Sequence, residues 1–158
     1  MPNEKIKPLK RLKNIVSLLK KRGKKIVFTN GCFDILHLGH VKYLQDSKNL
    51  GDVLVVAVNS DSSVKIIKQK GRPINPQKER AGVLAALGSV DYITFFNDDT
   101  PINAIKALKP DILVKGADWH VSKIVGKDFV ESCGGKVKTI PYLKGYSTTK
   151  IINKIKSL

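Results

Sequence analysis

Short apolar runs alternate with segments of helical spacing along most of the chain. The apolar runs predict strands at Ile26–Thr29, Val53–Val58, Tyr92–Phe96, Ile112–Lys115 and Lys136–Ile140. Helices are expected at about Gly39–Asn49, Pro76–Leu87, Pro101–Leu108 and Gly126–Cys133, with a last one from Thr148. Strands that are apolar throughout and separated by helices are typical of a parallel sheet covered on both faces. The pattern therefore predicts a doubly wound α/β fold with a five-stranded parallel sheet, which is a Rossmann-like arrangement.

The first 24 residues predict an additional helix. Apolar residues recur at helical spacing, at Leu9, Leu12, Ile15, Val16 and Leu19. Pro8 suits the first turn of that helix and Gly23 suits its end. We therefore expect a basic amphipathic helix within residues 1–24, packed on a single domain of residues 25–158. Its apolar side has no Trp or Phe, which disfavours the alternative of a helix that lies on a membrane surface.

Length and composition are those of one globular domain. The chain has 158 residues, of which 42% are hydrophobic and 27% are charged, so intrinsic disorder is excluded. The longest apolar run, Val53–Val58, is far shorter than the roughly 18 residues of a membrane span, and no signal-peptide stretch is present. We expect a cytoplasmic protein without a membrane partner. Reduced thiols are expected at Cys32 and Cys133.

The net charge of +16 raises the question of a nucleic-acid partner. Almost all of the excess is lysine, whereas base readers and phosphate clamps favour arginine. No aromatic residues are interleaved with the basic ones, as a stacking groove for single strands would need. We therefore favour a lysine surface that attracts a small anion, and keep a basic nucleic-acid-binding module as the non-enzymatic alternative.

Candidate chemistry lies after the predicted strands, where ligands bind in such folds. Neither of the common phosphate loops, G-x-x-x-x-G-K-[ST] and G-x-G-x-x-G, occurs there. Instead, His37 and His40 flank Gly39 where a helix should begin, so that two imidazoles and free backbone N–H groups can bind one phosphate. A zinc site with Cys32 would lack a fourth ligand. Two core histidines without function are the other alternative.

Several motifs carry a family resemblance. Residues 31–40, G-C-F-D-I-L-H-L-G-H, resemble the H-x-G-H signature of the cytidylyltransferase-like nucleotidyltransferases, and the Ser/Thr cluster in 145–151 resembles their second signature. Together with G-R-P-I-N-P at 71–76 and L-V-K-G-A-D-W at 113–119, residues 25–155 resemble the D-glycero-β-D-manno-heptose 1-phosphate adenylyltransferases. The resemblance implies transfer of AMP from ATP to that sugar phosphate, which yields ADP-heptose and pyrophosphate for lipopolysaccharide core or related heptose glycans.

The resemblance also implies partners and site residues. It implies a homodimer, a separate heptose kinase and phosphatase upstream (a fused kinase has no room here), and Mg²⁺ carried by the triphosphate rather than by a protein metal site. The residues implied as catalytic are His37, His40, Lys68 and Arg80. Those implied to bind the nucleotide are Thr29, Asn30, Gly31, Cys32, Phe33, Gly39, Gly116, Asp118, Trp119, Tyr146, Ser147 and Thr148. Those implied to bind the sugar phosphate are Asn59 and Arg72.

Four of the polar residues have structural interpretations as well. Asp118 has the sequence context of a helix cap or turn residue, and Lys68 that of a solvated loop lysine. Arg72 would either clamp the sugar phosphate or brace its loop. For Asp34 we expect a structural role, in which the carboxylate fixes a turn through backbone N–H groups.

A neighbouring family is the nearest competitor. The chain also resembles glycerol-3-phosphate cytidylyltransferases at residues 68–70, 118–119 and 147–149. Gly88 and Tyr142, however, stand where that family has arginines, and the loss of two phosphate clamps disfavours it. In the other direction, Gln69 stands where the heptose enzymes usually have glycine.

Overall fold

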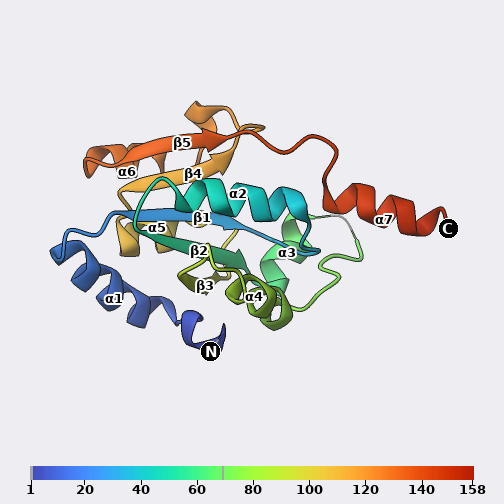
Figure 1. Ribbon diagram of the computed structural model, residues 1–158, viewed down its shortest axis with the longest axis horizontal. Coiled ribbons are helices and arrows are strands. Elements are labelled where there is room, and N and C mark those ends of the chain that lie inside the picture. Colours follow the sequence, from blue (N-terminus) through green and yellow to red (C-terminus); the bar gives the residue numbers. More distant parts are fainter. Residues whose placement is uncertain (1, 69) are drawn as a thin grey trace.

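A five-stranded, all-parallel sheet forms the centre of the molecule, as predicted (Figure 1). The computed structural model describes residues 2–68 and 70–158, so Gln69 lies outside the described residues. The strands are β1 (Ile26–Gly31), β2 (Val53–Asn59), β3 (Tyr92–Phe96), β4 (Ile112–Gly116) and β5 (Lys136–Ile140). Their order in the sheet is β3-β2-β1-β4-β5, and each neighbouring pair is parallel. The chain therefore reverses its direction of winding between β1 and β4.

Seven α-helices accompany these strands in the described part of the chain. They are α1 (Leu9–Lys21), α2 (Leu38–Lys48), α3 (Asp61–Ile67), α4 (Gln77–Ala85), α5 (Ile102–Leu108), α6 (Lys127–Ser132) and α7 (Thr148–Lys156). Two 3₁₀ turns, η1 (Pro2–Lys5) and η2 (Val121–Lys123), were not predicted, and neither was α3. The seven residues of α3 are too few to show a helical period. The helix begins because the Ser60 hydroxyl caps it by accepting a hydrogen bond from the Ser63 N–H.

Two hydrophobic layers cover the two faces of the sheet. In β2, Leu54, Val56 and Val58 point to the layer that contains α2 and α4, while alternate residues point to the layer that contains α1, α5 and α6. All seven residues of β2 are buried. Burial on both faces is why the strand sequences are continuously apolar instead of alternating.

Helix α1 packs on the domain, as expected from its spacing. Leu12 and Val16 are fully buried in the same layer as α5. Ahead of the helix, Ile6 forms a parallel bridge with Ile93, and the Lys7 N–H donates to the Ile93 carbonyl, which extends the sheet beyond β3. The boundary at residue 24 stays a prediction.

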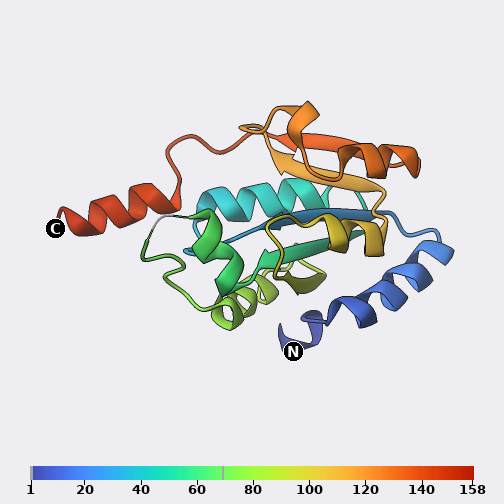
Figure 2. The same cartoon turned by 180° about the vertical axis from the view of Figure 1, so that it is seen from behind.

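Helix α7 is the exception to this compact packing. Both views show it projecting from the body of the molecule, with its first turn next to the carboxyl edge of the sheet (Figures 1 and 2). None of its residues is buried. Among the described residues, no helix combines the length and the apolar character that crossing a membrane requires.

Candidate active site

A cavity of about 730 Å³ opens at the carboxyl edge of the sheet. It is lined by segments that follow all five strands, and the expected site residues among them come from the segments after β1, β2, β4 and β5. Most of the expected site residues line it: Asn30, Gly31, Cys32, Phe33, His37, His40, Asn59, Lys68, Arg72, Gly116, Asp118, Trp119, Tyr146, Ser147 and Thr148. Thr29, Gly39 and Arg80 are not among the lining residues.

The two histidines form a stacked pair at the N-terminus of α2. Their ring centres are 3.8 Å apart and the rings are nearly parallel. His37 is the N-cap residue, and its Nδ1 accepts a hydrogen bond from the His40 N–H at 3.4 Å. Gly39 allows this arrangement, because a Cβ there would lie 3.0 Å from the His37 ring and 3.1 Å from the Tyr146 side chain. Gly39 thus acts by permitting a close approach.

Both imidazoles are neutral at pH 7. Burial, assisted by the neighbouring His37 ring, lowers the pKa of His40 to about 4, and burial also lowers the pKa of His37. Among the described residues the buried Nδ1 atom of His40 has no hydrogen-bond partner. The pair can therefore offer N–H groups to an anion without carrying a charge in the free protein.

The second helix terminus lies beside the first. The Ser147 hydroxyl caps α7 by accepting from the Lys150 N–H at 3.1 Å. The Thr148 hydroxyl donates to the Ile35 carbonyl in the loop after β1, at 3.4 Å. The positive ends of α2 and α7 therefore meet at one part of the cavity, an arrangement that suits a phosphate chain.

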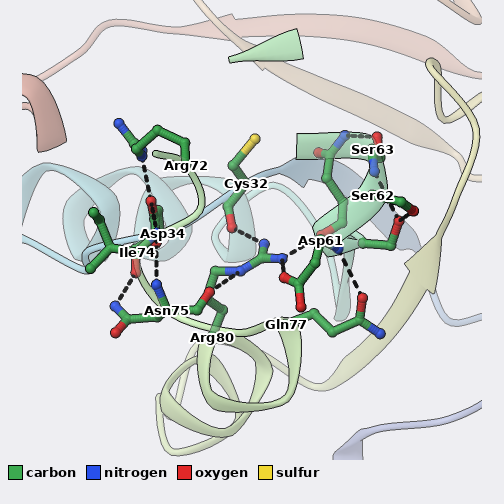
Figure 3. A network of polar contacts seen from close by, with 12 residues as sticks. Cys32, Asp34, Asp61, Ser62, Ser63, Arg72, Ile74, Asn75, Gln77 and Arg80 are labelled. Carbon is green, nitrogen blue, oxygen red and sulfur yellow. Dashed lines mark hydrogen bonds and ion pairs between the residues drawn. The ribbon is translucent and has the colours of Figure 1, made fainter. Parts of the chain in front are cut away.

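Arg80 is buried within the protein, where its guanidinium is surrounded by polar partners, and it is not among the residues that line the cavity (Figure 3). Its side chain is fully buried. The guanidinium donates to the carbonyl oxygens of Cys32, Asn59 and Asn75 and to the Asp61 carboxylate. These hydrogen bonds give Arg80 a positioning role inside the fold, and its expected contact with phosphates stays a prediction. Arg80 connects the ends of β1 and β2 to the loop before α4.

Asp34 and Arg72 form a second internal connection (Figure 3). The buried Asp34 carboxylate accepts from the N–H groups of Ile74 and Asn75 and from Arg72 Nε. Burial alone would raise the pKa of Asp34, but these hydrogen bonds outweigh it and hold the pKa below its usual value. Asp34 thus has the structural role predicted for it, but it holds a loop about 40 residues away. Arg72 braces that loop and also lines the cavity.

The remaining side of the cavity contains Lys115 and Tyr142, which the sequence did not predict as site residues. Lys115 is the penultimate residue of β4, and its ammonium group lies 5.6 Å from the centre of the Trp119 ring. Burial lowers the pKa of Lys115 to about 8, although the Asp118 carboxylate partly opposes this shift. The Tyr142 ring lies directly over Gly116, where a Cβ would come within 2.2 Å of the phenolic oxygen. A lysine at the end of an otherwise apolar strand was the available signal for Lys115.

Thr29 connects β1 to α2, since its hydroxyl is hydrogen-bonded to the Tyr43 hydroxyl at 2.8 Å. It is fully buried and supports α2 without facing the cavity.

In residues 2–68 and 70–158, His, Cys, Asp and Glu side chains form no group of three that could hold a metal ion.

Comparison with known proteins places this geometry in context. The model of the cytidylyltransferase-like family matches residues 28–154. The chain is 55% identical over 151 residues to the "Bifunctional protein HldE" of Geobacter metallireducens, covering 96% of this chain and 31% of that protein. It is 55% identical over 152 residues to the protein of the same name from Nitratiruptor sp., covering 96% of this chain and 32% of that protein. The chain thus spans about a third of the length of these curated relatives.

Two solved structures are also similar. The lipopolysaccharide core biosynthesis protein from Thermoplasma volcanium is 33% identical, with a TM-score of 0.64 over 79% of this chain and all of that one. The pantoate-beta-alanine ligase from Francisella tularensis is 17% identical, with a TM-score of 0.55 over 97% of this chain and 78% of that one. At that identity the second structure supports the fold alone.

Proposed function

The chain belongs to the cytidylyltransferase-like family, and from this premise we propose that it transfers AMP from ATP to D-glycero-β-D-manno-heptose 1-phosphate. The products are ADP-heptose and pyrophosphate. The observation that carries the proposal is the convergence of two helix N-termini and a stacked pair of neutral histidines on one cavity. The high identity to the HldE proteins and the similarity to a lipopolysaccharide core biosynthesis protein favour a sugar phosphate as acceptor.

The reaction needs no general base. A phosphate monoester has a second pKa near 6, so the phosphate group is already largely a dianion at pH 7. One of these oxygens attacks the α-phosphorus of ATP, the bond from that phosphorus to the β-bridging oxygen breaks, and pyrophosphate leaves with the electron pair. Catalysis is then reduced to holding two anions in line and stabilising the charge on the phosphoryl groups.

The residues of this chain suit that task. His37 and His40 offer N–H groups to the triphosphate, and we assign His40 to the α-phosphate, where charge develops in the transition state. Ser147, Thr148 and the first N–H groups of α7 bind the outer phosphates. Lys68 lines the cavity as a further cation for them. ATP would bring Mg²⁺ with it, and the ion would supply charge neutralisation at the phosphates.

The substrate test compares two pairs of reactants. We expect ATP with heptose 1-phosphate to exceed CTP with glycerol 3-phosphate by at least about a hundredfold in kcat/KM, or about 2.7 kcal/mol in transition-state binding. The measurement is pyrophosphate release from each pair. Turnover only with CTP would overturn the heptose assignment. Light scattering of the pure protein tests the proposed homodimer. The proposed acceptor would be supplied by a kinase and a phosphatase.

A further inference from the structure

The cavity has two sides, because it crosses the edge of the sheet. His37 and His40 come from α2, which packs on the sheet face that Val27 and Val114 share. Phe28 and Leu113 point to the opposite face. Since side chains alternate along a strand, Asn30 and Lys115 follow Phe28 and Leu113 to that opposite face. Both residues line the cavity.

Asn30 and Lys115 also come from adjacent strands of the sheet. The register of β1 and β4 pairs Val27 with Ile112 and Phe28 with Leu113. Asn30 and Lys115 each lie two residues beyond the last of these pairs. This is the point where the chain reverses its winding and the two strands diverge, the usual ligand position in a doubly wound sheet.

Neither polar group is satisfied by the described part of the protein. The Oδ1 atom of Asn30 is buried without a hydrogen-bond partner among residues 2–68 and 70–158. In the same residues Lys115 Nζ has no hydrogen bond and no ion pair within 4 Å; the groups that act on it are Asp118, Cys32 and the Trp119 ring. Unpaired polar groups in such a place are costly unless a ligand completes them.

We propose that Asn30 and Lys115 form the acceptor subsite, in which Lys115 binds the phosphate of the sugar 1-phosphate and Asn30 accepts a hydrogen bond from a sugar hydroxyl. The inference rests on the proposed function and assigns Asn30 to the sugar instead of the nucleotide. In-line displacement supports it, because the attacking oxygen must approach the α-phosphorus from the side opposite the departing pyrophosphate. With the triphosphate at α2 and α7, the acceptor belongs on the face of Asn30 and Lys115.

Steady-state kinetics test the subsite. In Lys115→Met, the KM for heptose 1-phosphate should rise at least about tenfold, while the KM for ATP stays within about twofold. Asn30→Ala should raise the acceptor KM in the same selective way. Lys138→Met is the matched control, because it removes the same charge from an exposed strand position outside the cavity lining. It should leave both constants unchanged, and equal changes in both constants for Lys115→Met would overturn the proposal.

The pH dependence of kcat/KM for the acceptor separates a lysine that binds substrate from a lysine with a structural role only. Burial holds the pKa of Lys115 near 8, so the ammonium is charged below that pH and neutral above it. We therefore expect kcat/KM for the acceptor to fall above about pH 8. Arginine stays charged, so the fall of kcat/KM above about pH 8 should disappear in Lys115→Arg. The same fall should remain in Cys32→Ala. If kcat/KM for the acceptor still falls above about pH 8 in Lys115→Arg, the proposal is contradicted, even if Lys115→Met fails to fold.

Failure of the subsite and failure of the proposed function give different results. If the wild-type protein releases pyrophosphate but Lys115→Met has an unchanged acceptor KM, the subsite is wrong and the function stands. If no pyrophosphate is released, calorimetric titration with heptose 1-phosphate decides. Binding that Lys115→Met loses would support the subsite without the function, and equal or absent binding in both proteins would overturn it.

Discussion

Replacing Arg80 by methionine removes a buried guanidinium but keeps most of the side-chain volume. The guanidinium donates to three carbonyl oxygens, with distances of 3.0 Å to Asn75 and 2.8 Å to Asn59 and a short contact to Cys32. It also donates to Asp61, whose carboxylate is partly exposed and can be hydrated after the change. The variant therefore leaves three acceptors without their charged donor and no stranded buried charge.

The expected loss follows from those three acceptors. Losing a charged donor costs each of these carbonyls, one buried and two partly buried, roughly 1 to 1.5 kcal/mol, so Arg80→Met should lower the free energy of unfolding by about 3 to 5 kcal/mol. That is a large part of the ~5–15 kcal/mol of a typical domain. In a chain of this size each kcal/mol shifts the Tm by roughly 2 to 4 °C, so we expect a drop of roughly 6 to 20 °C.

Thermal unfolding followed by circular dichroism measures this drop. Arg22→Met is the control, because it removes the same charge from an exposed position at the end of α1. Its Tm should change by less than about 2 °C. If Arg80→Met is as stable as Arg22→Met, the guanidinium does not hold the strand ends together, and a direct role at the phosphates would return.

Four other predictions concern the cavity and the surface. His40→Ala should lower kcat about a hundredfold or more, with a smaller change in ATP affinity. Burial depresses the pKa of His40 to about 4, so the stability of the wild-type protein should fall between pH 6.5 and 4 more than that of the variant, as thermal unfolding at several pH values would reveal. Ser147→Ala should weaken ATP binding more than AMP binding in calorimetry, and equal losses would reduce Ser147 to a helix cap. Gly116→Ala should lower the Tm in the wild-type background but less in Tyr142→Ala, because the three atoms nearest to its Cβ all belong to the tyrosine side chain; equal losses would contradict that contact. Nucleic-acid binding should be weak and decline steeply with salt in filter-binding assays, and sequence-selective binding at physiological ionic strength would favour the binding-module alternative.

The roles that the sequence missed belong to residues whose partners are distant in the chain. Arg80 sits on α4, and its acceptors lie at Cys32, Asn59, Asp61 and Asn75. A lone arginine on a helix has the same local pattern whether it meets solvent, substrate or four internal acceptors. The choice among these is made by the packing of α4 against the strand ends.

The amino-acid sequence by itself determined the five strands, the α2 terminus with its two histidines, and the Ser/Thr cap of α7. These features depend on interactions within a few residues, namely hydrophobic periodicity and helix capping. Only the tertiary structure decided which face of the sheet each polar strand end points to and which charges are satisfied internally. Side-chain alternation along β1 and β4, together with the winding reversal, places Asn30 and Lys115 on the sheet face opposite α2. Register and winding are set by burial summed over the whole sheet, which no short stretch of sequence encodes.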